Sequence, residues 1–157
     1  MSGDVVLRDC SHSDFNLIAE MERSYYREVD PTEAFDEREF QKEFKSALSD
    51  PKSNIFVALV EGRFSGFIWL DEYDDLGYIT NIHVAKEYRG RGIGKRLLSA
   101  AEDYFRAKNK KRLQLEVVES NSTALNLYTR SGFKLTRYEA ERDQYTPAGD
   151  YLEKSLT

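Results

Sequence analysis

The amino-acid sequence predicts an α/β protein, with a mixed sheet of about seven strands, parallel and antiparallel, and about four helices. Short apolar, β-branched runs alternate with longer stretches in which apolar residues recur at helical spacing. The 157 residues, 40% of them apolar, suffice to bury the core of one domain that spans residues 1–157. No repeat, low-complexity tract or interdomain linker divides the chain.

The N-terminal part is predicted to run strand, helix, helix. Val5–Leu7 is a β-branched run, and Ser11 or Ser13 can cap the helix that follows. The apolar residues of this first helix are Phe15, Ile18, Ala19 and Met21. After the break at Asp30-Pro31, a second helix is predicted up to Asp50-Pro51, because the residue before a proline disfavours helical backbone. Its apolar residues are Phe35, Phe40, Phe44 and Leu48.

Three consecutive strands form the predicted centre of the sheet. Ile55–Val60 and Phe64–Leu70 are β-prone runs joined by Glu61-Gly62-Arg63, a hairpin signal because glycine adopts a positive φ without strain. A polar turn at Asp71–Asp75 leads to the third strand, Leu76–Val84. The three strands are therefore expected to be adjacent and antiparallel.

The C-terminal part is predicted to alternate helices and strands. A glycine-rich loop precedes an amphipathic helix that Asn109 closes. The apolar face of this helix is formed by Ile93, Leu97, Leu98, Ala101, Tyr104 and Phe105. Leu113–Val118 alternates like a half-buried strand, and Asn121 or Ser122 caps the short helix after it. The last two predicted strands are Phe133–Tyr138 and Asp150–Leu156.

Charge and composition exclude several classes of protein. The net charge of −5 argues against a dedicated nucleic-acid binder, although basic residues crowd the stretch Arg106–Arg112. Cys10 is the only cysteine, so no intrachain disulfide forms, and two histidines do not assemble a usual zinc site, so no metal is predicted. No apolar run approaches the roughly 20 residues that span a bilayer, and Met1–Leu7 lacks a signal-peptide pattern. We expect a cytoplasmic protein with no nucleic-acid and no membrane partner.

The segment with the clearest chemistry is Arg89-Gly90-Arg91-Gly92-Ile93-Gly94. Its three glycines lie between a strand and a helix start, where free N–H groups and the helix dipole attract an anion. Arg89, Arg91 and Lys95 add positive charge, so a phosphate group is the expected ligand. Arg96 after Gly94-Lys95 excludes a Walker A loop, and Lys95 also breaks a dinucleotide fingerprint. The alternative is a glycine-rich turn that merely starts a helix.

The stretch from Ile82 to Leu98 resembles the central acetyl-CoA motif of the GNAT superfamily of N-acetyltransferases. The matching residues are Ile82-His83-Val84, Tyr88 to Lys95 and Leu97-Leu98, with Lys86 where many members carry proline. The resemblance implies the GNAT acyl-CoA N-acyltransferase fold, whose sheet is splayed at its central strands. It implies that the pantetheine arm of acetyl-CoA binds the backbone of Ile82, His83 and Val84. The residues expected around the pyrophosphate are Arg89, Gly90, Arg91, Gly92, Ile93, Gly94 and Lys95.

A second block, from Leu115 to Phe133, resembles the next GNAT motif in residue types and spacing. It is similar to the block in bacterial ribosomal-protein N-terminal alanine acetyltransferases, where the matching Glu and Tyr act as base and acid. The resemblance therefore implies that Glu116 accepts a proton from the acceptor amine and that Tyr128 donates one to the leaving thiolate. It also implies that Asn121 donates a hydrogen bond to a pantetheine carbonyl.

Each of these side chains also has a simpler interpretation. Tyr128 can be a packing residue, Glu116 a charge on the sheet face, and Asn121 a helix cap. A histidine in a strand, such as His83, is more often packed or exposed than functional.

The resemblance predicts an acetyl-CoA-dependent enzyme that acetylates a primary amine by direct attack, without a covalent enzyme intermediate. A protein N-terminal α-amine is the leading acceptor, and a small amine, a polyamine or a lysine side chain is the alternative. The hypothesis of another class is a non-catalytic acyl-CoA-binding or interaction module. Acidic residues such as Glu28 and Asp71–Asp75 could attract a cationic acceptor, and the resemblance is compatible with a homodimer.

Overall fold

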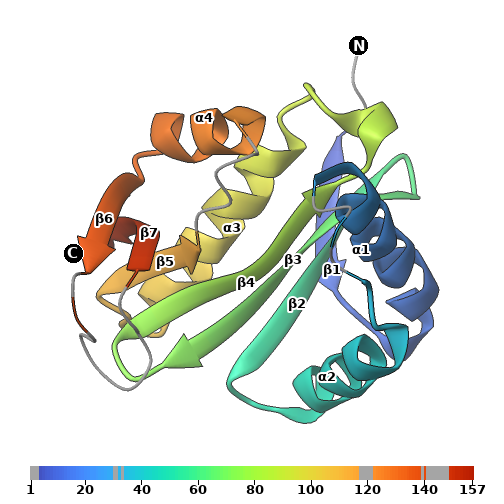
Figure 1. Cartoon of the computed structure of the whole chain (residues 1–157), viewed down its shortest axis with the longest axis horizontal. Coiled ribbons are helices and arrows are strands. Elements are labelled where there is room, and N and C mark those ends of the chain that lie inside the picture. The colour runs from blue at the N-terminus through green and yellow to red at the C-terminus, as the bar shows by residue number, and fades with distance from the viewer. Residues whose placement is uncertain (1–3, 30–31, 33, 117–121, 139, 141–148) are drawn as a thin grey trace.

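The computed structural model of the chain describes residues 4–29, 32, 34–116, 122–138, 140 and 149–157. These residues form seven strands and four α-helices in the predicted order (Figure 1). The strands are β1 (Val5–Asp9), β2 (Ser53–Val60), β3 (Arg63–Tyr73), β4 (Leu76–Val84), β5 (Arg112–Glu116), β6 (Lys134–Tyr138) and β7 (Gly149–Ser155). The helices are α1 (Phe15–Val29), α2 (Glu37–Ser49), α3 (Ile93–Ala107) and α4 (Ser122–Arg130), with short 3-10 turns η1 (His12–Asp14) and η2 (Lys86–Tyr88).

All of these strands belong to one sheet with the order β1-β2-β3-β4-β5-β7-β6. Neighbouring strands are antiparallel except β4 and β5, which are parallel. Parallel neighbours need a crossover connection, and α3 provides it between β4 and β5. The predicted mixed sheet with a central antiparallel meander is confirmed.

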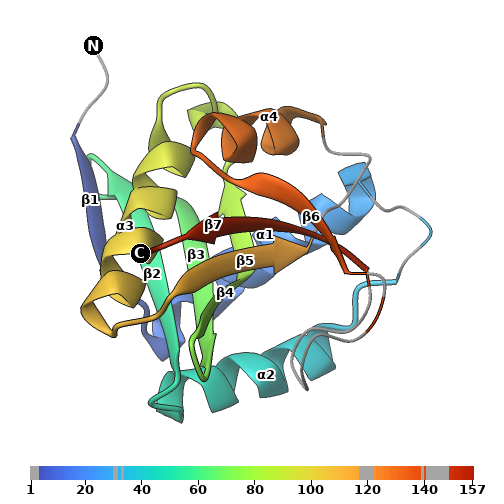
Figure 2. The ribbon, with the colours of Figure 1, turned by 90° about the vertical axis from the view of Figure 1, so that its left-hand side faces the viewer.

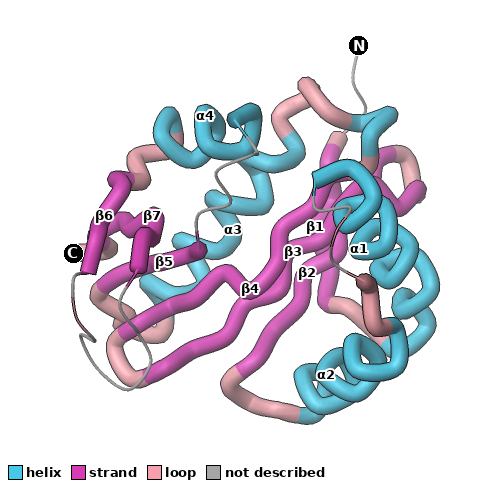
Figure 3. Tube along the Cα trace, in the orientation of Figure 1, coloured by secondary structure: helices cyan, strands magenta, loops and turns pink. Residues whose placement is uncertain are grey.

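Helices cover both faces of the sheet (Figures 1 and 3). Successive strand residues point to opposite faces, so Phe67 packs under α1 and α2 while Ile68 packs under α3. The core on the α1–α2 face contains Ile18, Ala19, Phe40, Phe44, Ala47, Ile55, Val57, Phe67 and Trp69. The core on the α3 face includes Ala58, Ile68, Leu70, Ile79, Ile93, Leu97, Leu98, Ala101, Phe105, Leu113 and Leu115.

The second helix begins later than the sequence predicts. Phe35, predicted inside it, lies before it, because Asp36 caps α2 by accepting a hydrogen bond from the Glu39 N–H at 3.1 Å. Phe35 still packs against α1, with its ring stacked on Tyr26 at 5.6 Å between centroids. Phe35 is therefore apolar because it packs against α1, and it does not belong to α2.

The turn between β3 and β4 is shorter than predicted. β3 runs to Tyr73, so the polar turn shrinks to Asp74 and Asp75. Asp71 is tolerated within the strand because Ser53 and Thr80 donate hydrogen bonds to its carboxylate. The predicted turn between β2 and β3 is confirmed, with positive φ at Glu61 and Gly62.

β4 and β5 are paired over only part of their length. Leu76–Tyr78 pair with Arg112–Gln114, and the described residues show no further pair between the two strands, although β4 continues to Val84. Figure 2 shows β4 and β5 running at an angle to each other. The predicted splay of the central strands is therefore present. None of the described helices is both long and apolar enough to cross a bilayer.

Candidate active site

The loop before α3 has the backbone geometry that suits an anion. Gly90 and Gly92 have φ of +78° and +82°, a left-handed conformation that other residues adopt only with strain. Apart from chain neighbours, no atom lies within 4 Å of the position that a Cβ would take at either glycine. Gly92 is the N-cap of α3, whose first backbone N–H groups have no partner within the helix. A phosphate group can occupy this open space and accept hydrogen bonds from those N–H groups.

Three basic side chains flank the open space at Gly90 and Gly92. The Arg89 guanidinium extends back to β4, where its Nε donates to the Val84 carbonyl at 3.1 Å. Its Nη1 also lies 3.7 Å from the Glu28 carboxylate of α1. Arg91 lies over an aromatic ring of η2, with 5.3 Å between its Cζ and the ring centroid, and Lys95 is exposed in the first turn of α3. The loop therefore combines positive charge with contacts to β4 and α1.

The last residues of β4 present backbone groups on the side from which β5 has diverged. Ala85 donates its N–H to the Ser65 carbonyl at 2.8 Å. Hydrogen-bonded residues alternate along an antiparallel ladder, so His83 also points its N–H and C=O towards β3. The N–H and C=O groups of Ile82 and Val84 consequently point towards the gap between β4 and β5, where the Val84 C=O already accepts the hydrogen bond from Arg89 Nε. An extended ligand in that gap could pair with them as an added strand.

Tyr128 lies on α4 with its ring against the sheet side of the helix. The ring contacts Phe133, with 6.1 Å between the ring centroids. Burial raises the pKa of Tyr128, and the nearby Tyr25 of α1 adds to the effect. The phenol therefore stays protonated at neutral pH, which is the form that a proton donor requires.

Val84 and the helix that carries Tyr128 both approach Gly94 in the first turn of α3. A Cβ at Gly94 would lie 2.8 Å from the Leu127 Cδ2 atom, next in sequence to Tyr128. The same Cβ would lie 3.9 Å from the Val84 Cγ2 atom at the end of β4. The glycine-rich loop, the free edge of β4 and the helix that carries Tyr128 therefore border one region, to which α1 contributes Tyr25.

Glu116 is the last described residue of β5, and it is exposed. It pairs in register with Tyr151 of β7. Burial is the main cause that raises the pKa of Tyr78 and of Tyr151, and the Glu116 carboxylate adds to the effect in both. Glu116 thus lies beside two tyrosines near the point where β5 leaves β4. Asn121, the remaining predicted site residue, lies outside the described residues.

His83 belongs to a buried pair that sequence reasoning did not find. Its Nε2 lies 2.7 Å from the Glu22 Oε1 atom of α1, and Glu22 is only 5% exposed. The imidazole also contacts the rings of Tyr25 and Phe67, with centroid distances of 5.0 and 5.4 Å. The sequence signal for Glu22 is its position four residues after Ile18, which places a carboxylate on the apolar face of the first helix.

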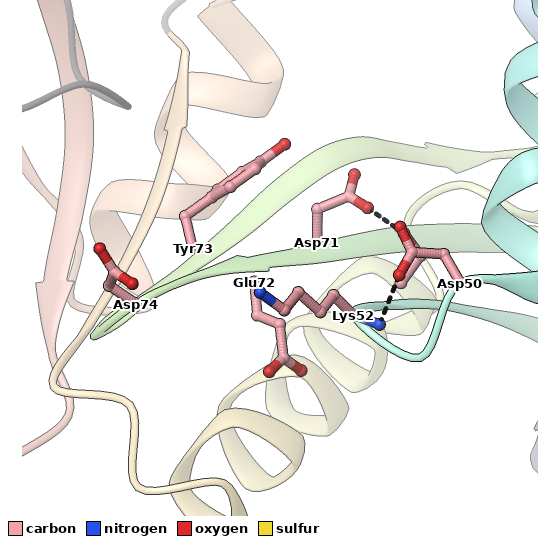
Figure 4. Close-up of a pocket in the computed structure, with 7 residues that line it drawn as sticks. Asp50, Lys52, Asp71, Glu72, Tyr73 and Asp74 are labelled. Carbon is pink, nitrogen blue, oxygen red and sulfur yellow. Dashed lines mark hydrogen bonds between the residues drawn. The ribbon is translucent and has the colours of Figure 1, made fainter.

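A cavity of about 250 Å³ lies at the other end of β4, by the turn that joins it to β3 (Figure 4). Its lining residues are Asp50, Lys52, Ser53, Asp71, Glu72, Tyr73 and Asp74. Lys52 donates its N–H to the Asp50 carboxylate at 2.9 Å, and Glu72 forms ion pairs with Lys108 and Lys110. None of the predicted catalytic or cofactor-binding residues lines this cavity, although four residues of the acidic run Asp71–Asp75 do. The carboxylates of Asp50, Asp71 and Glu72 are engaged by groups of their own chain.

The fold and the region around Gly94 define a class of protein. A helix start that suits an anion lies beside a gap between two parallel strands, so a suitable ligand has a phosphate end and an extended arm. Acyl-CoA thioesters have this form. The site therefore suits a protein that binds an acyl-CoA. The described residues contain no group of three or more His, Cys, Asp or Glu side chains that could hold a metal ion.

Comparison with known proteins gives the family. The model of the acetyltransferase (GNAT) family matches residues 15–133, and the chain belongs to this family. It is an acetyl-CoA-dependent N-acetyltransferase, with acetyl-CoA as cosubstrate. The resemblance seen in the sequence is thereby confirmed.

Relatives and solved structures agree with this assignment. A candidate ribosomal protein bS18-alanine N-acetyltransferase of Bacillus subtilis is 28% identical over 134 residues, which cover 85% of this chain and 83% of the relative. The PaiA N-acetyltransferase of Thermoplasma acidophilum, solved in complex with coenzyme A, has a TM-score of 0.77 at 20% identity and covers 97% and 99% of the two chains. The ribosomal-protein-S18-alanine N-acetyltransferase of Escherichia coli has a TM-score of 0.72 at 20% identity, with 98% and 95% covered. The two structures confirm the predicted GNAT fold.

Proposed function

We propose that this protein transfers the acetyl group of acetyl-CoA directly to a primary amine, and that the preferred acceptor is the α-amine at a protein N-terminus. The observation that carries the transfer is the meeting of the α3 start, the free edge of β4 and α4 around Gly94. The B. subtilis relative supports a protein acceptor, since its name specifies acetylation of an alanine of ribosomal protein bS18. Residues 1–157 are proposed to act as one catalytic domain.

Acetyl-CoA is proposed to bind along β4 and across the start of α3. The pyrophosphate would accept hydrogen bonds from the first N–H groups of α3, and Arg89, Arg91 and Lys95 would supply the opposite charge. The pantetheine arm would pair with the backbone of Ile82 and Val84, which points into the gap. This arrangement would place the thioester beside α4.

Tyr128 is proposed as the proton donor of the reaction. The amine nitrogen forms a bond to the thioester carbonyl carbon, the carbon–sulfur bond breaks, and the thiolate takes the phenolic proton of Tyr128. The position of Tyr128 on α4 supports this role, because the neighbouring Leu127 packs over the first turn of α3. Its protonated state at neutral pH also supports it.

Glu116 is the proton acceptor that the sequence resemblance implies. Its carboxylate is exposed beside Tyr78 and Tyr151, so a bridging water would carry the proton from the acceptor ammonium. Its negative charge would also attract that ammonium. Glu116→Gln removes the charge and is expected to lower kcat/KM.

The proposed function is tested by acetyl-CoA turnover over a panel of acceptors. The panel contains peptides with free N-termini, N-blocked peptides with one lysine, spermidine and small primary amines. We expect the highest kcat/KM for a free peptide N-terminus. Faster turnover of the lysine peptide or of spermidine would show that the preferred acceptor is not a protein N-terminus. CoA binding without any turnover would support the non-catalytic module instead.

Tyr128→Phe is the substitution that tests the proton donor. It should lower kcat by ~10²-fold or more, because general acid catalysis contributes this much, while the affinity for CoA stays unchanged. Tyr104→Phe is the matched control, since Tyr104 lies on α3 and packs against Phe56 and Phe105. Steady-state kinetics and calorimetric titration with CoA measure both variants. Native kcat in Tyr128→Phe would remove Tyr128 from the mechanism.

A further inference from the structure

The His83–Glu22 pair lies where β4 has already separated from β5. His83 is five residues beyond Tyr78, the last residue of β4 that pairs with β5. Its side chain keeps 14% of its surface exposed, whereas the Glu22 side chain keeps 7%. The imidazole is therefore reachable at the edge of the gap, and the carboxylate behind it is enclosed.

Packing alone does not explain a carboxylate at this position. Glu22 belongs to α1, on the face that also buries Ile18 and Ala19 against the sheet. An ionised carboxylate costs several kcal/mol to bury, and a buried pair is often no more stabilising than an apolar pair of similar volume. Buried ionisable groups that face a cleft are candidates for functional roles.

Tyr25 connects this pair to the proposed proton donor. Its ring lies edge-on to the His83 imidazole at 5.0 Å. The same residue is close enough to Tyr128 to affect its titration. Tyr25 is therefore near both His83 and Tyr128, so an acceptor amine bound beside Tyr25 would approach both.

We infer that His83 is the catalytic residue that takes the proton of the acceptor ammonium, and that Glu22 is a positioning residue that orients the imidazole. The inference rests on the direct acetyl transfer proposed above. It replaces the exposed Glu116 of β5 as the proton acceptor with a residue of β4, and leaves to Glu116 the attraction of its negative charge for the ammonium.

The hydrogen bond to Glu22 decides which ring nitrogen acts. A carboxylate only accepts, so Nε2 carries the proton that bonds Glu22 Oε1, and Nδ1 keeps its lone pair for the substrate. When Nδ1 takes a proton, the Glu22 carboxylate stabilises the imidazolium. In other enzymes, too, a histidine base is oriented by a neighbouring group that hydrogen-bonds its second ring nitrogen.

The protons and bonds of the reaction balance with these two groups. The ammonium gives one proton to His83 Nδ1, and the resulting amine attacks the thioester carbonyl carbon. The carbon–sulfur bond breaks, the thiolate takes the Tyr128 proton, and the second ammonium proton restores Tyr128. His83 then releases its proton to water, so one proton leaves per amide formed.

Few other titratable groups of the described residues face the pair. Glu22 and Tyr25 come from α1, and Phe67, the contact from β3, does not titrate. Glu43 of α2 has its pKa raised mainly by burial, and Glu22 is among the carboxylates that add to this effect. Tyr128 of α4 lies beyond Tyr25. A change in the pH profile on replacing His83 can therefore be assigned to the imidazole.

The test compares His83→Gln with His12→Gln, which replaces the other histidine of the chain, exposed in η1. With the best acceptor of the panel, His83→Gln should lower kcat/KM by ~10²-fold at neutral pH while CoA affinity stays native. The deficit should narrow as the pH rises towards the pKa of the acceptor, where the free amine no longer needs a base. His12→Gln should keep the native profile.

Two further variants separate catalysis from folding. Free imidazole should restore part of the turnover of His83→Ala but not of Glu116→Gln. Glu22→Gln keeps the shape of the side chain without its charge, so it should lower kcat with native CoA affinity. Glu20→Gln, at an exposed position of the same helix, is its control.

Three results would overturn the inference. One is a loss of kcat/KM in His83→Gln that stays constant from neutral to alkaline pH. Another is a parallel loss of CoA binding and turnover, which indicates a structural role. The third is a fall of kcat/KM at acidic pH that disappears in Glu116→Gln and persists in His83→Gln. These results leave the proposed acetyl transfer intact, whereas absence of turnover by the native protein over the whole panel would overturn both.

Discussion

At the scale of single residues, Gly92 and Gly62 both adopt a left-handed backbone conformation, in different parts of the fold. Their φ values are +82° and +77°, and a Cβ at either position would have no atom within 4 Å. Gly92→Val and Gly62→Val should therefore lower the free energy of unfolding by a similar amount, about 1–2 kcal/mol, from backbone strain. Gly92→Val alone should abolish CoA binding, since its side chain would fill the space proposed for the pyrophosphate. Urea unfolding and calorimetric titration with CoA measure the two effects.

Gly62→Val serves as the control because it lies in the turn between β2 and β3, away from the glycine-rich loop. Native CoA affinity in Gly92→Val would place the pyrophosphate elsewhere. Loss of binding in both variants would mean that backbone strain, rather than the filled space, disrupts the site.

The site residues that were predicted share a local cause. A glycine with positive φ before a helix depends on its immediate neighbours, so the loop from Arg89 to Gly94 was visible in the sequence. The pair of His83 and Glu22 was not, because 61 residues separate the two and only the packing of α1 on β4 joins them. Sequence patterns report local requirements, so the place of Glu22 on the apolar face of α1 can be read from the sequence but its contact with His83 cannot.

At the scale of elements, the contact of α4 with α3 depends on a missing side chain. Gly94→Ala should raise the helix preference of α3, by up to ~1 kcal/mol. The added Cβ would lie 2.8 Å from the Leu127 Cδ2 atom, however, so α4 must shift or Leu127 must change rotamer. We expect Gly94→Ala to lower kcat, because α4 carries Tyr128. The unfolding free energies of Gly94→Ala, Leu127→Ala and the double variant should show a coupling of about 0.5–3 kcal/mol.

Ser99→Ala is the control for this cycle, since Ser99 is exposed on the same helix. Its effect should add to that of Leu127→Ala without coupling. Additive effects of Gly94→Ala and Leu127→Ala, with native kcat in Gly94→Ala, would show that α4 adapts to the extra methyl group at no cost.

The elements themselves were predicted better than their ends. Apolar spacing located all of the described α-helices and strands, because each buries apolar side chains on at least one face. It misplaced Phe35, whose ring packs on Tyr26 from outside α2, and it ended β3 at Leu70. The extra residues of β3 are polar, and Asp71 remains in the strand through hydrogen bonds from Ser53 and Thr80. Such bonds depend on neighbours distant in the sequence.

At the scale of the whole molecule, the gap between β4 and β5 has no local pattern in the sequence. Both strands read as ordinary apolar runs, yet their pairing stops at Tyr78 and Gln114. Only the family resemblance predicted the splay, because strand twist and the crossover through α3 set the angle between the two strands. The gap is also where α1, α3 and α4 contribute to the site, so the sheet arranges residues from across the chain.

The stability of the whole molecule in acid depends in part on the joint between β1 and α1. Asp14, which is 5% exposed, accepts hydrogen bonds from both terminal nitrogens of Arg8 at 2.8 and 2.9 Å. The Ser11 N–H donates a further one at 2.9 Å. The hydrogen bonds from Arg8 are the main cause that lowers the pKa of Asp14 to about 2. This joint fixes the start of the helix that carries Glu22 and Tyr25.

A carboxyl whose pKa is lower in the folded than in the unfolded chain stabilises the fold above the unfolded value, about 3.9, and loses this contribution as the pH falls through the folded value. Asp14→Asn should therefore lower the free energy of unfolding at pH 7, and its stability should depend less on pH between about 4 and 2 than that of the native protein. Urea unfolding at several pH values measures this, with Asp9→Asn, at an exposed neighbour, as control. A native pH dependence in Asp14→Asn would show that other carboxyls govern the acid transition, and that the joint between β1 and α1 opens independently of it.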